Sequence, residues 1–195
     1  MKIVLASGSP RRLELLRMIG FMDFDVIPSE REERLPVGLA PAQAVCEIAL
    51  EKAKNVSRLC EHGDILHDML IIAADTLVYL DGKPIGKPDS ADEAAAMLRQ
   101  LSGRQHTVFT GLALLTSRDH AVGAEKTDVF FRNISEEEIS AYVNTGEPLD
   151  KAGAYGAQGR GAIFIERIDG DFFNVMGLPV CRLSKMLREF GVEIV

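Results

Sequence analysis

The segment SGSPRR, residues 7–12, places hydroxyls and guanidinium groups at the predicted start of a helix. The first turn of a helix carries unpaired N–H groups and a partial positive charge, which favour a bound anion. Ser7 and Ser9 add hydroxyl donors that could bind a substrate. Arg11 and Arg12 are unfavourable at a helix start unless an anion offsets their charge. The segment therefore predicts an anion site, with a surface loop of solvated arginines as the alternative.

Asp75 is a carboxylate inside an otherwise apolar predicted strand. Six apolar residues, 69–74, precede it, and Leu77 and Val78 follow Thr76. Burying a carboxylate without a partner is costly, so Asp75 needs a cation, a metal ion or a catalytic task. The alternative is a hydrogen-bonded acid with a structural role.

Lys52 lies at the border of the apolar face of a helix predicted over residues 41–56. The stem of such a lysine is covered and its ammonium is directed at the element beside the helix. Lys54 has a simpler explanation, because it lies three residues after Glu51 and can form a solvated ion pair.

Lys87 is placed by a predicted hairpin. Asp81-Gly82 favours a two-residue turn, and counting back from that turn puts Lys87 opposite Thr76. Adjacent strand residues point to opposite faces, so strict pairing favours Thr76 over Asp75 as the neighbour of Lys87, and the count supports only proximity to Asp75.

Strand and helix patterns alternate along the 195 residues, which indicates an α/β fold in one domain, residues 1–195. Apolar runs predict strands at residues 2–6, 24–28, 69–80, 106–116, 125–133 and 163–168. Helical periodicity and capping residues predict helices near residues 10–19, 41–56, 91–102, 136–144 and 178–190. Capping boxes are expected at Ser90 with Glu93 and at Ser135 with Glu138.

Composition excludes several classes of protein. The net charge of −7 argues against a binder of nucleic-acid polymers, and no apolar run approaches the roughly 20 residues of a membrane span. Three cysteines without metal-binding spacing suggest reduced thiols and a cytoplasmic location. The glycine-rich segment 153–161 lacks the dinucleotide-binding spacing, and the chain contains no P-loop motif.

Several motifs occur in one order along nearly the whole chain, and together they resemble the Maf family of nucleoside triphosphate pyrophosphatases. The motifs are SGSPRR (7–12), EKA (51–53), AADT (73–76), GKP (86–88), LSGRQH (101–106), TGEPLDKAG (145–153), YGAQG (155–159) and GLPV (177–180). The resemblance implies a two-lobed α/β fold, with an elongated mixed sheet flanked by helices and a central substrate cleft. It also implies hydrolysis of a nucleoside triphosphate to the monophosphate and pyrophosphate with a divalent metal, Mg²⁺ or Mn²⁺.

The resemblance assigns roles to individual residues. Asp75 matches the catalytic base of the family and would also touch the metal, which Glu33 accompanies. Glu33 is matched to the acidic residue of the family by its position 19 residues before Lys52. The residues expected around the substrate phosphates are Ser7, Arg11, Arg12, Lys52 and Lys87, and the two lysines are counted with the catalytic group.

Arg11, Thr76 and Gln158 match the branch of the family that acts on dTTP and UTP. An amide both donates and accepts hydrogen bonds, which suits the edge of thymine or uracil. This branch implies a house-cleaning role on canonical or modified pyrimidine nucleotides.

Two alternatives remain open. The first is the same chemistry on 7-methyl-GTP or on a broad set of non-canonical nucleotides. The second is a nucleotide-binding regulator of cell division and septum formation without turnover. The expected partners are the nucleotide and, as an open option, a second copy of the chain in a homodimer.

Overall fold

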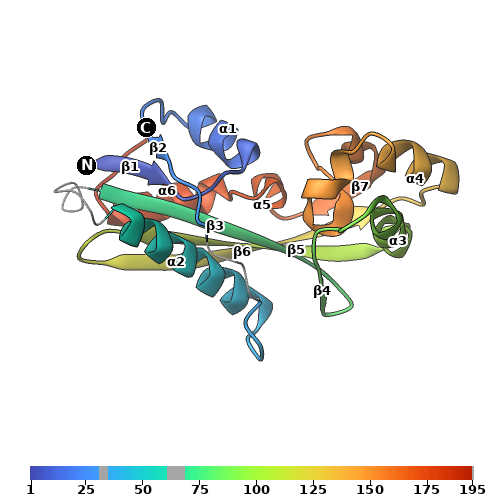
Figure 1. Ribbon diagram of the computed structural model, residues 1–195, viewed down its shortest axis with the longest axis horizontal. Helices are drawn as coiled ribbons and strands as arrows, with labels where there is room; N and C mark the ends of the chain where they lie inside the picture. Colours follow the sequence, from blue (N-terminus) through green and yellow to red (C-terminus); the bar gives the residue numbers. More distant parts are fainter. Residues whose placement is uncertain (31–34, 61–68, 195) are drawn as a thin grey trace. The chain divides into compact units, whose positions relative to one another are not determined.

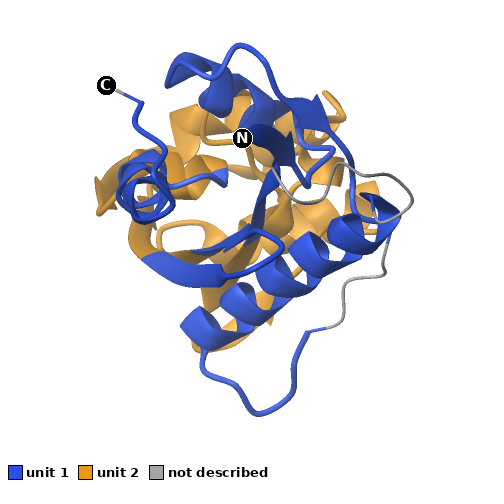
Figure 2. Cartoon of the chain, turned by 90° about the vertical axis from the view of Figure 1, so that its left-hand side faces the viewer, with its two compact units in different colours: residues 1–75, 110–125, 177–195 blue, residues 76–109, 126–176 orange. Residues whose placement is uncertain are grey.

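The computed structural model describes residues 1–30, 35–60 and 69–194, in which strands and helices alternate along the chain (Figure 1). Two compact units are present (Figure 2). Unit 1 consists of residues 1–75, 110–125 and 177–195, and unit 2 of residues 76–109 and 126–176. The single catalytic domain and the central cleft expected from the resemblance stay predictions.

In the described residues, seven strands form one mixed sheet, with the order β2-β1-β3-β5-β6-β7 and with β4 paired to β3. Their bounds are β1 Lys2–Leu5, β2 Asp25–Val26, β3 Met69–Leu80, β4 Lys83–Ile85, β5 Gln105–Leu115, β6 His120–Phe131 and β7 Ile165–Asp169. β1 runs parallel to β2 and β3, whereas the pairs β3–β4 and β6–β7 are antiparallel. The predicted α/β class is therefore confirmed.

All five predicted helices are present. Their bounds are α1 Pro10–Met18, α2 Pro41–Cys60, α3 Ala91–Leu101, α4 Glu136–Val143, α5 Phe172–Met176 and α6 Val180–Glu189, with short 3₁₀ segments η2 Glu147–Asp150, η3 Ala152–Ala154 and η4 Arg160–Phe164. The short helix α5 was not predicted, because five residues are too few to show a helical period. No described helix has the length and apolar character needed to cross a membrane.

The capping predictions are only partly correct. Ser135 and Glu138 form the complete capping box at the start of α4. At α3, Ser90 Oγ accepts from the N–H of Glu93 at 3.2 Å, but the Glu93 carboxylate accepts from the N–H of Asp89 at 2.7 Å. The second half of that predicted box is therefore replaced by a bond one residue further out.

The core of unit 1 forms where α2 packs its apolar stripe against the sheet. Ala49 and Ala53 of α2 share a buried cluster with Val4 of β1 and with Ile71 of β3. Small residues allow this close approach, and at Gly111 of β5 an added Cβ would overlap the backbone of Val45. The helix that carries Lys52 thus packs on β1 and on β3, the strand that carries Asp75, and its backbone approaches β5 closely.

The core of unit 2 is rich in aromatic rings. Phe131 packs edge-to-face against Tyr155 and His106, and Tyr142 packs edge-to-face against Phe164. These rings lie in one buried cluster with residues of α3 and the end of β3. Tyr155 belongs to the glycine-rich segment 153–161 and packs that segment into the cluster.

Candidate active site

Asp75 and Lys52 form a buried ion pair in unit 1. Lys52 Nζ donates to Asp75 Oδ1 at 2.7 Å, and their side chains are 11% and 4% exposed. The predicted direction of Lys52 is confirmed, because its ammonium leaves the border of the α2 apolar face and reaches β3. Lys54 instead pairs with Glu51 at 3.0 Å on the more exposed side of α2, as predicted.

The second oxygen of Asp75, Oδ2, is buried. Among the described residues, none forms a hydrogen bond with Asp75 Oδ2. A buried carboxylate oxygen without a donor is costly unless it takes a proton, a water molecule or a cation. It can therefore serve as a general base or as one oxygen ligand of a hard metal ion.

The described residues supply only part of a possible metal site. They contain no cluster of three or more His, Cys, Asp or Glu side chains that could hold an ion. Glu33, the other predicted metal residue, lies outside the described residues. Mg²⁺ is commonly held by one or two carboxylates together with substrate phosphates, so Asp75 Oδ2 fits such an ion as one of its ligands.

The start of α1 lies beside the same strand. Leu5 of β1 pairs with Ile72 of β3, and the N–H of Ala6 donates to the carbonyl of Ile72 at 2.8 Å. Because β1 and β3 are parallel, the segment after Ala6 begins next to the stretch of β3 that leads to Asp75. The predicted anion-binding segment and the predicted base thus belong to one region of unit 1.

Ser7 is the centre of a small polar network at this helix start. Its Oγ accepts from the N–H of Ser9 and from Nη1 of Arg12, both at 3.2 Å. Arg12 Nε also donates to the carbonyl of Gly177 at 2.8 Å. A hydroxyl oxygen that accepts twice can still donate its own proton to a ligand.

Ser9 occupies the N-cap position of α1 as predicted, but its side chain does not cap the described first turn. Arg11 is half-buried in that turn. The structure therefore brings Ser7, Ser9 and Arg12 together, with Arg11 beside them in sequence. The bond from Arg12 to Gly177 joins residues 165 positions apart, and local sequence patterns gave no signal for it.

The predicted hairpin forms, but its paired strands are too short to reach the predicted pair of Thr76 and Lys87. Asp81 and Gly82 have φ angles of 52° and 74°, as a primed two-residue turn demands. The antiparallel pairs run from Leu80–Lys83 to Val78–Ile85, where β4 ends. The ladder therefore does not extend to the predicted pair of Thr76 and Lys87.

The early end of β4 has a local cause and a long-range cause. Pro84 has no N–H to donate to the ladder, and the carbonyl of Gly86 accepts from the N–H of Gly153 at 3.0 Å. The exposed Lys87 thus follows a residue that is tied to the glycine-rich segment of unit 2 rather than to β3. Thr76, half-buried, is the next residue after Asp75 on β3.

Gln158 lies in a tight turn of unit 2. The N–H of Gly159 donates to the carbonyl of Gly156 at 3.2 Å, and Gln158 is exposed in that turn. The turn is bonded to two side chains that sequence reasoning did not single out, Glu147 and Tyr142. The only sequence signal for Glu147 was its place in the TGEPLDKAG motif.

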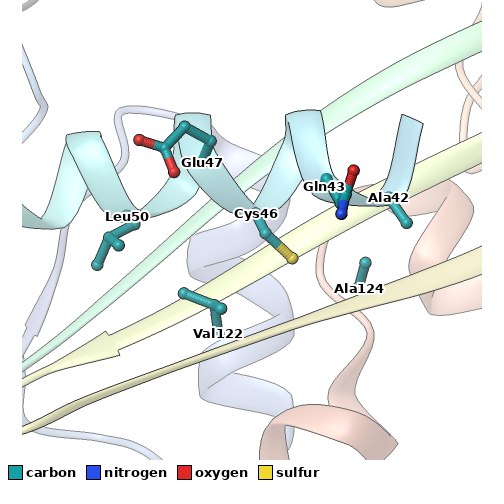
Figure 3. Close-up of a pocket in the computed structure, with 7 residues that line it drawn as sticks. All are labelled: Ala42, Gln43, Cys46, Glu47, Leu50, Val122 and Ala124. Atoms are coloured by element: carbon teal, nitrogen blue, oxygen red, sulfur yellow. The ribbon is translucent and has the colours of Figure 1, made fainter. Parts of the chain in front are cut away.

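A pocket of about 440 Å³ in unit 1 lies apart from these residues (Figure 3). It is formed by α2 and β6 and lined by Ala42, Gln43, Cys46, Glu47, Leu50, Val122 and Ala124. In Figure 3 the Cys46 thiol points toward β6, and burial raises the pKa of that thiol. No lysine or arginine is among its lining residues, so the pocket does not suit a triphosphate.

Comparisons with known proteins agree with the motif pattern. A family model described as Maf-like protein matches residues 2–190. A protein from Moorella thermoacetica named dTTP/UTP pyrophosphatase is 48% identical, covering 99% of this chain and 97% of its own length. A protein of the same name from Pelotomaculum thermopropionicum is 47% identical, and the match covers 99% of this chain and 98% of that protein. Among solved structures, a HAM1 protein from Coxiella burnetii has a TM-score of 0.53 and 17% identity over 97% of this chain and 99% of its own, a likeness of fold alone.

Proposed function

Because the chain belongs to the Maf-like protein family, we propose that it hydrolyses nucleoside triphosphates to the monophosphate and pyrophosphate, with dTTP and UTP as preferred substrates. Two relatives named dTTP/UTP pyrophosphatase, which match over nearly their whole length, support this substrate class. The observation in this chain that carries the proposal is Asp75, a buried carboxylate with one oxygen bonded to Lys52 and the other unbonded among the described residues.

Asp75 is the general base of the proposed reaction. Its Oδ2 accepts a proton from a water molecule while the water oxygen attacks the α-phosphorus. The bond from the α-phosphorus to the oxygen that bridges to the β-phosphorus breaks, and pyrophosphate leaves with that electron pair. Lys52 Nζ donates to Oδ1 at 2.7 Å, which keeps the carboxylate oriented for the transfer.

Positive groups bind the phosphates in this proposal. The N-terminus of α1 and the side chains of Ser7, Ser9, Arg11 and Arg12 are assigned to phosphate oxygens. The bonds that Ser7 makes with Ser9 and Arg12 support the assignment, because they fix these donors before a ligand arrives. Lys87 is assigned to the phosphates from its motif match.

A divalent ion, Mg²⁺ or Mn²⁺, is part of the proposal. Asp75 and Glu33, both from their motif matches, are the residues that would hold it. When bound, the ion supplies positive charge that offsets the repulsion between the phosphates and an incoming nucleophile.

Base selection is assigned to Arg11, Thr76 and Gln158, which match the pyrimidine branch of the family. The amide of Gln158 can both donate to and accept from the edge of uracil or thymine. Such a site rejects bases that leave its polar groups unpaired. A role in clearing canonical or modified pyrimidine nucleotides follows from this selectivity.

A cytoplasmic location is also proposed. Cys46, Cys60 and Cys181 are all unpaired thiols, as in proteins of a reducing compartment. Homodimer formation stays a prediction.

The test is a panel of nucleotides with identification of the products by mass spectrometry. We expect dTTP and UTP to yield the monophosphate and pyrophosphate far faster than ATP or 7-methyl-GTP does. A diphosphate with orthophosphate would contradict attack at the α-phosphorus. A preference for 7-methyl-GTP would contradict the pyrimidine assignment alone, and binding without any turnover would favour the regulator.

A further inference from the structure

The turn that carries Gln158 is held from inside unit 2. It runs from Gly156 to Gly159 and is closed by the 3.2 Å bond between those two residues. Its second residue, Ala157, is buried at 6% exposure, whereas its third, Gln158, is exposed. The turn is therefore anchored through the buried Ala157 and presents the side-chain amide of Gln158 to solvent.

Glu147 and Tyr142 bind both ends of this turn. At its start, the N–H of Gly156 donates to Tyr142 Oη at 3.1 Å. Just past its end, the N–H of Arg160 donates to Glu147 Oε2 at 3.0 Å, and that of Gly161 donates to Oε1 at 3.4 Å. Tyr142 Oη in turn donates to Glu147 Oε1 at 2.9 Å, so one carboxylate links the two ends.

Glycines occupy the positions at which the backbone of the segment passes close to the side chains of Glu147 and Tyr142. A Cβ at Gly156 would lie 2.8 Å from Glu147 Oε1, and one at Gly161 would lie 2.7 Å from Tyr142 Oη. A Cβ at Gly159 would overlap the Glu147 carboxylate. The segment is therefore wrapped around one carboxylate, which explains glycines that fit neither a dinucleotide fingerprint nor a P-loop.

Glu147 is ionised in this setting. Partial burial alone would raise its pKa. The hydrogen bonds from Arg160, Tyr142 and Gly161 and the charge of Lys151 outweigh burial and lower the pKa below its usual value. Lys151 Nζ also donates to the backbone carbonyl of Glu147 at 2.7 Å, which fixes the residue from the other side.

We infer that Glu147 is a positioning residue for base selection, acting by holding the Gly156–Gly161 segment so that Gln158 is presented in one orientation. This rests on the proposed function, in which Gln158 contacts the pyrimidine. Glu147 itself touches no substrate. Its loss frees the turn, so the discrimination between bases falls while the chemistry at Asp75 continues.

The test compares Glu147→Gln with Glu136→Gln. The first change keeps the size but turns one accepting oxygen into an NH₂ group that faces N–H donors. Glu136 also accepts three side-chain hydrogen bonds, all from Arg99, but none from the turn. We expect the ratio of kcat/KM for dTTP to that for ATP to fall about tenfold in Glu147→Gln, mainly through KM for dTTP, and to stay unchanged in Glu136→Gln.

Hydrogen–deuterium exchange gives a readout without substrate. The amides of Arg160 and Gly161 should exchange faster in Glu147→Gln than in the wild type, with no such change in Glu136→Gln. An unchanged base ratio or unchanged exchange in a folded Glu147→Gln overturns the inference. If the wild type cleaves neither dTTP nor UTP, the proposed function fails and the role in selection falls with it, even where exchange behaves as expected.

Gly159→Ala decides the matter if Glu147→Gln does not fold. Gly159 has φ −109°, which any residue adopts, so the new methyl group acts only by pushing against the Glu147 carboxylate. It removes no hydrogen-bonding group. A lowered dTTP-to-ATP ratio in this variant supports the inference, and an unchanged ratio overturns it.

Discussion

Replacing Lys52 by Met removes the ammonium that lies 2.7 Å from Asp75 and leaves the carboxylate buried without that cation. Breaking a buried ion pair from one side costs about 3–5 kcal/mol. Because the Lys52 side chain keeps 11% exposure, through which water can reach the pair, we expect the lower end, about 3 kcal/mol. At roughly 2–4 °C per kcal/mol for a chain of this size, Tm should fall by about 6–12 °C.

Lys54→Met is the matched control on the same helix. Lys54 pairs with Glu51 at 3.0 Å, but these side chains are 40% and 30% exposed. Solvent screening reduces such a pair to about 0.5 kcal/mol or less. The two variants thus remove the same charge and add the same side chain, and they differ in the burial of the partner.

The double variant Lys52→Met with Asp75→Asn removes both charges. We expect it to regain most of the stability lost in Lys52→Met, because no unpaired charge stays buried. Turnover should not return, since the amide cannot accept the proton of water. Urea unfolding followed by circular dichroism measures the free energies, and pyrophosphate release measures turnover. A loss of stability in Lys52→Met that equals the loss in Lys54→Met would refute the reasoning.

Three further predictions concern Asp75 by itself, His106 and Gly111. Asp75→Asn should lower kcat by about 10²–10⁴-fold while calorimetry still detects nucleotide binding, because only the general base is lost. His106 is buried, and burial lowers its pKa from 6.5 to about 4. Its contribution to the free energy of unfolding is therefore complete above pH 6.5 and falls by about 3 kcal/mol as the pH drops to about 4, and His106→Gln should remove this loss. Gly111→Ala should destabilise the protein by about 1–3 kcal/mol, because its methyl group would overlap the backbone of Val45 and overpack the core.

Each of these has a result that would contradict it. If Asp75→Asn keeps more than half of the wild-type activity at saturating metal, Asp75 is not the general base. If the free energy of unfolding of His106→Gln depends on pH between 6.5 and 4 as it does in the wild type, His106 is not the cause of the loss of stability. A Gly111→Ala variant as stable as the wild type in urea would mean that β5 and α2 leave room for a methyl group at this position.

Local patterns were sufficient wherever neighbours in sequence decide the outcome. The apolar stripe of α2, the long apolar run of β3 and the turn at Asp81-Gly82 were all predicted, because helical period, strand length and turn chemistry act within a few residues. The same reasoning placed Lys52 at the edge of its helix face and isolated Asp75 in an apolar strand. It identified both members of the ion pair without showing that they pair.

Only the tertiary structure decided which partner each group meets. Arg12 bonds to Gly177, β4 ends at Ile85 because Gly86 is bonded to Gly153, and Glu147 holds the turn of Gln158. None of these contacts leaves a periodic trace in the sequence, since each joins one polar atom to a backbone group brought near by the packing of other elements. A hydrogen bond depends on position to within a few tenths of an ångström, whereas composition and period specify only which face of an element is buried.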